Sequence, residues 1–89
     1  MKTKEPNAEV VRAAMLQVVD NQLRDSEPPE TRQTLERLMA ESHSEAEARQ
    51  LIAAVVSSEI YAVLKHNRPY DEAKYVAALQ RLPKLPWDS

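Results

Sequence analysis

The chain has 89 residues and a formal net charge of −2 at pH 7, and it contains no glycine, cysteine or phenylalanine. This length suffices for one domain, and so short a chain buries only a modest share of its surface, which makes a partner subunit a serious alternative to a monomer. The absence of cysteine excludes disulfides and thiol chemistry, and the absence of glycine excludes glycine-rich phosphate loops.

Charge and hydropathy narrow the class of protein further. Acidic side chains outnumber basic ones by 14 to 12, and no basic stripe is visible, so we expect no nucleic-acid partner. No apolar run has the length needed to cross a bilayer, and no apolar segment follows the charged first residues. We therefore expect no membrane span and no secretory signal, and a cytoplasmic location is the default.

The first two predicted helices span about residues 7–24 and 29–41. In the first, the apolar side chains recur at helical spacing, with Gln22 on the same face. The following prolines end this helix because the residue before a proline avoids the α conformation, and Pro29 suits the first turn of the second helix. Leu35, Leu38 and Met39 form the apolar stripe of the second helix.

The third and fourth predicted helices span about residues 44–66 and 71–82. Ser44 and Glu47 have the spacing of a capping box, in which each side chain binds the other residue's backbone N–H. Asp71 suits the N-cap of the fourth helix, and Tyr70 and Tyr75 occupy the two positions of a hydrophobic staple.

These elements predict an all-α fold, in which four helices within residues 7–82 form one compact, bundle-like domain. No segment alternates polar and apolar residues as a strand would. Residues 1–6 are expected to be disordered. Residues 83–89 are expected to form an extended tail, whose Trp87 either folds back onto the bundle or meets a partner.

The stretch V-V-S-S-E-I-Y-A-V-L, residues 55–64, places Glu59 close to the centre of an apolar helix face. A buried carboxylate needs a partner, and a glutamine amide offers two N–H donors. We therefore predict that Gln22 and Glu59 face each other between the first and third helices. Arg12, or Tyr70 and Tyr75 near the start of the fourth helix, could supply the remaining donors. His66 lies near the edge of the same stripe, and with Gln22, Glu59 and Arg12 it completes a candidate polar cluster or ligand site.

Two structural explanations compete with a functional role for Glu59. Its carboxylate can lie at the rim of the face and reach water, or a buried polar pair can fix the register of the helices. Neither Ser57 nor Ser58 has a histidine spaced to activate it, so small serines that allow close helix packing are the preferred interpretation. With two histidines, no cysteine and no paired Glu-x-x-His elements, we predict no metal ligands, no cofactor and no catalytic residues.

Five short motifs follow one another in an order that resembles a family of short bacterial proteins classed as a domain of unknown function. They are Asn21-Gln22-Leu23, Glu27-Pro28-Pro29-Glu30, Glu59-Ile60-Tyr61, Arg68-Pro69-Tyr70-Asp71 and Tyr75-Val76-Ala77-Ala78-Leu79. The resemblance covers roughly residues 7–82. Members of that family often carry H-x-x-x-H pairs in the first and third helices, which suit a metal site. The matching positions here are Arg12, Leu16, Ala46 and Gln50, so the resemblance implies no metal ligands for this chain.

The sequence thus favours a non-enzymatic helical protein that acts through contacts, either as a homodimer or with an unidentified protein partner. Apolar faces on the first and third helices exceed what four short helices need to cover one another. The candidate interface residues are Leu16, Leu23, Tyr61, Leu64 and Trp87. The alternative is a small-ligand or metal-binding protein with its site around Glu59, Gln22 and His66, and this alternative predicts a concave pocket that opens onto Glu59.

Overall fold

A computed structural model of the chain describes residues 8–88, and these residues form four α-helices and no strand. The helices are α1 (Ala8–Asp25), α2 (Pro29–Ala40), α3 (Glu45–His66) and α4 (Glu72–Arg81). The all-α prediction is confirmed, and every helix end lies within one residue of its predicted position. The predicted disorder of residues 1–6 lies outside the described residues.

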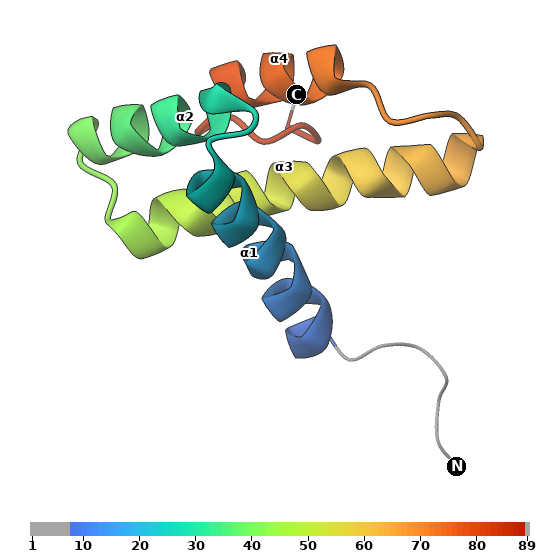
Figure 1. The fold of residues 1–89 in the computed structure, drawn as a ribbon, viewed down its shortest axis with the longest axis horizontal. Helices are drawn as coiled ribbons and strands as arrows, with labels where there is room; N and C mark the ends of the chain where they lie inside the picture. The colour runs from blue at the N-terminus through green and yellow to red at the C-terminus, as the bar shows by residue number, and fades with distance from the viewer. Residues whose placement is uncertain (1–7, 89) are drawn as a thin grey trace.

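The longest helix, α3, packs against each of the other three (Figure 1). Figure 1 shows α2 and α4 lying along one side of α3, while α1 crosses α3 obliquely. The N-terminal half of α1 projects beyond the crossing, and residues 9–14 are all exposed. Because α1 covers only part of α3, the C-terminal third of α3 keeps an open face.

Local side-chain chemistry sets the starts of α3 and α4 as predicted. Ser44 Oγ accepts a hydrogen bond from the Glu47 backbone N–H at 3.0 Å, and Glu47 Oε1 accepts one from the Ser44 N–H at 3.0 Å. Asp71 Oδ1 accepts hydrogen bonds from two backbone N–H groups in the first turn of α4. The rings of Tyr70 and Tyr75 lie 6.3 Å apart between centroids, which is a contact distance for an aromatic pair.

Among residues 8–88, three residues adopt positive φ at the ends of helices. Ser26 follows α1 with φ 54°, Ser42 follows α2 with φ 81°, and Asn67 caps α3 with φ 50°. Helices commonly end in this left-handed conformation, usually at a glycine, which this chain lacks. Each serine costs about 1–2 kcal/mol relative to a right-handed conformation, and asparagine tolerates the position better.

The core lies where α1, α2 and α4 meet α3. Its largest fully buried apolar side chains come from all four helices and from the residue after α4, and they are Val19, Leu38, Ile52, Val55, Tyr75, Leu79 and Leu82. Ala48 and Ala53 on α3 are also buried, and their small side chains allow close approach of a neighbouring helix.

Arginines of α2 contact the C-terminal ends of α1 and α4, and an arginine of α3 contacts α1 where the two helices cross. Arg32 donates a hydrogen bond to the Leu23 carbonyl at 2.7 Å, and Arg37 donates to two carbonyls at the end of α4. A positive charge near the C-terminus of a helix is stabilising because it lies next to the negative end of the helix dipole. Arg49 of α3 forms an ion pair with Asp20 of α1, which links the two crossing helices.

The tail differs from its predicted extended form. Residues 82–88 make successive turns, in which Leu85 N–H donates to Asp88 Oδ2 and Asp88 N–H donates to the Leu85 carbonyl, both at 3.0 Å. Leu85 packs against the core, whereas Trp87 remains 63% exposed. The tail therefore folds back onto the bundle and is anchored by Leu85 rather than by the tryptophan.

Candidate functional site

Gln22 is half-buried on α1, and its amide oxygen is held by two hydroxyl groups. Gln22 Oε1 accepts a hydrogen bond from Tyr75 OH at 2.8 Å and another from Thr31 Oγ1 at 2.8 Å. The predicted pairing of Gln22 with Glu59 is therefore wrong as to the partner. The tyrosine that donates to the amide comes from α4 and is 53 residues away in the sequence. Tyr75 is one of the donors expected for this cluster, although its bond to Gln22 itself was not predicted.

This hydroxyl–amide cluster, formed by Gln22, Thr31 and Tyr75, is a structural network. Thr31 is 0% exposed and Tyr75 is 1% exposed, and each hydroxyl finds an acceptor. Burial raises the pKa of the Tyr75 phenol, and its hydrogen bonds with Thr31 and Gln22 partly oppose this effect. The phenol thus stays neutral as a donor, and the network ties α1, α2 and α4 together.

Glu59 is half-buried and lines an apolar cavity of about 400 Å³. Gln22 and Tyr70 line the same cavity, so the predicted neighbourhood of Gln22 and Glu59 exists without a direct bond. Within residues 8–88 the Glu59 carboxylate makes no hydrogen bond or ion pair. Partial burial, and after it the charges of Tyr75, Glu72, Glu59 and Asp71, together raise the pKa of Tyr70 to about 12.

His66 and Arg12 lie away from this cavity, so the predicted four-residue cluster is not assembled. His66 is exposed at the last position of α3, beyond the region that the other helices cover. Arg12 is exposed on α1 and lines a different cavity, because the oblique crossing carries this part of α1 away from Glu59. In the described residues no group of three or more His, Cys, Asp and Glu side chains could hold a metal ion.

The candidate interface residues divide into two groups. Tyr61, Leu64 and Trp87 are exposed, by 62%, 76% and 63%. Leu23 is buried in the core and Leu16 packs against it, so both are corrected from exposed interface residues to residues that stabilise the fold. The helical wheel did not predict the burial of these two leucines, because α2 packs against the C-terminal part of α1. The sequence pattern of α1 alone does not show that contact.

One side of α3 carries an uncovered stripe, which we call the α3 seam and define as Gln50, Ala54, Ser57, Tyr61 and Leu64. These residues follow one another at intervals of four, three, four and three, which is the spacing of a coiled-coil contact line. Ala54 is half-buried and the other four are exposed. Ile60 and Val11, which are 38% and 37% exposed, extend the apolar character of this side.

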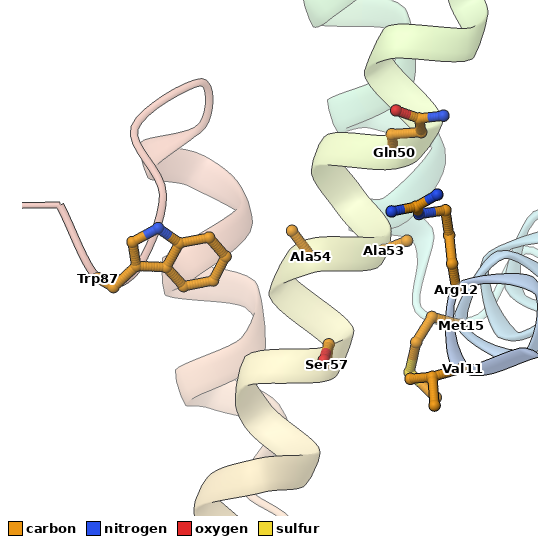
Figure 2. A pocket seen from close by; sticks show the side chains of 8 residues that line it. All are labelled: Val11, Arg12, Met15, Gln50, Ala53, Ala54, Ser57 and Trp87. Carbon is orange, nitrogen blue, oxygen red and sulfur yellow. The ribbon is translucent and has the colours of Figure 1, made fainter. Parts of the chain in front are cut away.

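A cavity of about 300 Å³ lies along the N-terminal half of the seam. Figure 2 shows Trp87 on one side of α3 and the side chains of α1 on the other, with Ala54 and Ser57 between them. The small side chains leave a hollow, whose walls are Val11, Met15 and Trp87 and whose polar end is formed by Arg12 and Gln50. Such a hollow can receive a large apolar side chain from outside.

A third cavity, which is a groove of about 250 Å³, has a different chemistry and was not predicted from the sequence. Its basic lining residues are Arg68, Lys74, Arg81 and Lys84, which come from the α3–α4 connection, α4 and the tail, and Glu59 is its one acidic lining residue. Lys74 and Arg81 are seven residues apart and therefore lie on one face of α4. This spacing is the feature of the sequence that could have indicated a basic face on this helix. The turns of the tail, which bring Lys84 to that face, were not predictable from the spacing.

None of the described helices combines the length and apolar character that crossing a bilayer requires. Comparison of the chain with protein-family models, with curated protein sequences and with solved structures finds no significant match.

Proposed function

We propose that this protein is a self-associating interaction module, in which the α3 seams of two copies pair antiparallel about a two-fold axis near Ser57. The observation that carries the proposal is the uncovered contact line on the longest helix, whose exposed apolar side chains are Tyr61 and Leu64. Exposed apolar side chains on a line of coiled-coil spacing are typical of a helix that packs against another helix.

Side-chain sizes along the seam favour a second copy as the occupant. In an antiparallel pairing centred on Ser57, Ala54 of one copy faces Tyr61 of the other, so a small residue meets a large one. Leu64 then lies beside Gln50 of the other copy, at the cavity that Met15 and Trp87 bound. A two-fold axis repeats each of these contacts.

Charge along α3 supports the antiparallel direction. The first turn of α3 is acidic, with Glu45 and Glu47, and its last turn is basic, with Lys65 and His66. Glu47 and Lys65 flank the seam on the same side, so an antiparallel pairing brings Glu47 of one copy near Lys65 of the other. A parallel pairing would instead bring like charges together.

The free energy that burial of the seam contributes can be judged from Leu64. Full burial of a leucine side chain stabilises by about 1.5–3 kcal/mol, and Leu64 is 76% exposed in the single chain, so its burial contributes about 1–2 kcal/mol. Two-fold symmetry doubles this amount. The substitution Leu64→Arg therefore weakens dimerisation by a factor of about 30 or more.

The experiment combines light scattering after chromatography with cysteine cross-linking. The natural chain has no cysteine, so Ser57→Cys introduces one thiol at the proposed axis, and Ser58→Cys is a matched control about 100° around the helix. We expect mild oxidation to cross-link Ser57→Cys and to leave Ser58→Cys largely monomeric. We also expect Leu64→Arg to dissociate the dimer, and Met39→Arg, at a 43% exposed position on α2, to retain it. A wild-type protein that stays monomeric at its highest usable concentration refutes the proposal.

A second candidate function is binding of a small apolar ligand in the 400 Å³ cavity. Its apolar walls with two polar groups, Gln22 and Glu59, have the composition and size of many ligand sites. Native mass spectrometry of protein purified without chelators tests it, because a retained ligand adds a defined mass. Retention of that mass by Glu59→Leu would argue against a role for the carboxylate in binding.

A further inference from the structure

The groove between the C-terminal half of α3, α4 and the tail concentrates positive charge on a chain of net negative charge. Four basic side chains line it and one carboxylate, that of Glu59, opposes them. The whole chain carries a formal charge of −2, so this local excess does not follow from composition. Four positive charges and one negative charge give the lining of the groove a formal charge of +3, which is opposite in sign to the charge of the whole chain.

The pairing of basic residues distinguishes this groove from the rest of the surface. Arg24, Arg37 and Arg49 form ion pairs, Arg32 binds a carbonyl, and Lys65 lies over the Tyr61 ring. Within residues 8–88, five basic side chains make no hydrogen bond, ion pair or ring contact. They are Arg12, Arg68, Lys74, Arg81 and Lys84, and all except Arg12 line the groove.

We propose that this groove binds a small phosphate-bearing molecule. Lysine and arginine donate charge-assisted hydrogen bonds to phosphate oxygens, and arginine can do so with two N–H groups at once. Ala62, Ala77 and Ala78 line the groove between the charges, and their small side chains leave room for the ligand. Leu85 and Pro86 supply an apolar wall on which the non-phosphate part of such a molecule can pack.

The shape of the groove favours a small molecule over a nucleic acid. The positive side chains converge on one hollow of about 250 Å³ and do not form a stripe along the molecule. A duplex or a single strand needs a basic track that follows many successive phosphates, and the net charge of −2 opposes its approach. Two or three linked phosphates match the number of cations in the groove.

The groove is independent of the α3 seam. Glu59 and Ala62, the α3 residues that line it, lie on the side of the helix turned away from Ser57. Failure of self-association therefore leaves phosphate binding untouched, and failure of phosphate binding leaves self-association untouched. Light scattering under the same conditions separates the two results.

The experiment is a titration of isotope-labelled full-length protein with inorganic pyrophosphate, followed by NMR. We expect saturable shifts at the backbone amides of the groove and none along the seam. The double variant Lys74→Gln/Arg81→Gln should weaken binding by about tenfold or more, because it removes two charge-assisted contacts. The control Arg24→Gln removes a charge from an exposed side chain outside both the groove and the seam, and should stay within about twofold of wild type, since only long-range charge changes.

Three results would overturn the assignment. They are the absence of saturable shifts, an equal loss of affinity in the control variant, and equal binding of sulfate at the same ionic strength. A short single-stranded oligonucleotide that binds much more tightly than pyrophosphate, with shifts that spread beyond the groove, would replace the small ligand by a nucleic acid. Saturable pyrophosphate binding that the double variant loses and the control keeps supports the proposal.

Discussion

The hydroxyl–amide cluster of Gln22, Thr31 and Tyr75 offers the sharpest test of what holds this bundle together. The substitution Gln22→Leu keeps a side chain of similar size and removes the one acceptor that both hydroxyls share. The companion variants Tyr75→Phe and Thr31→Val each remove one donor. The triple variant removes the whole network and leaves an apolar contact in its place.

The magnitudes follow from burial and from the geometry of the three groups. A buried hydroxyl without a partner costs about 1–3 kcal/mol, and both hydroxyls are almost fully buried. Thr31 Oγ1 and Tyr75 OH lie 3.3 Å apart, so after loss of the amide one can still donate to the other. Gln22→Leu should therefore lower the free energy of unfolding by about 2 kcal/mol, which is the cost of one orphaned donor and not of two.

The other variants should behave differently from Gln22→Leu. Tyr75→Phe leaves the amide oxygen with its bond from Thr31, so we expect a loss of about 1 kcal/mol. The triple variant leaves no unpaired polar atom in the cluster, so its loss should be well below the sum of the three single losses. Non-additivity of this sign is the signature of a shared network.

The assay is urea unfolding followed by circular dichroism, at one fixed protein concentration because self-association would make stability depend on concentration. Gln33→Leu, at an exposed position on α2, is the matched control and should change stability by no more than about 0.5 kcal/mol. Equal losses for Gln22→Leu and Gln33→Leu would refute the network. Strict additivity in the triple variant would refute the sharing of one acceptor.

Two further predictions concern the end of α4 and its tyrosine neighbour. The Arg37 side chain is 36% exposed and donates two hydrogen bonds, of 2.9 and 3.1 Å, to carbonyls at the end of α4. Arg37→Met removes both bonds and should lower the free energy of unfolding by about 2 kcal/mol. Arg24→Met, at a side chain that is 70% exposed, should cost less than about 0.5 kcal/mol in the same urea assay, and equal losses would contradict the capping role. Burial and neighbouring charges raise the pKa of Tyr70 to about 12, so the folded state holds this proton after the unfolded chain has released it, near pH 10. Ionisation of Tyr70 should therefore leave the free energy of unfolding unchanged below about pH 10 and lower it as the pH rises toward 12. Thermal unfolding measured between these two pH values should show a smaller loss of stability in Tyr70→Phe than in the wild type. An equal loss of stability in the variant would show that Tyr70 is not its source.

The helices could be predicted because their causes are local. Ser44 with Glu47, and Asp71 with the first turn of α4, act across two or three residues, and the prolines act on their immediate neighbours. The left-handed residues that end α1, α2 and α3 act on the same scale, although without glycine the sequence did not mark them.

The candidate site was predicted only in part because its partners are distant in the sequence. Gln22 and Glu59 do line one cavity, as their positions on two apolar faces indicated. The amide nevertheless binds Tyr75, because α4 returns along α3 and delivers a buried hydroxyl to that point. The basic groove depends in the same way on the connection before α4 and on the turns that follow it.

By itself the sequence determined the number, type and limits of the helices, the absence of thiol chemistry, and the presence of more apolar surface than four short helices can cover. Only the tertiary structure decided which part of that surface remains open. The packing of α2 against α1 buries Leu23, whereas the oblique crossing of α1 leaves Leu64 exposed, although both residues lie on apolar stretches of their helices. The physical reason is that capping and helix propensity act within a turn, whereas a crossing angle reflects side-chain packing summed over all the helices.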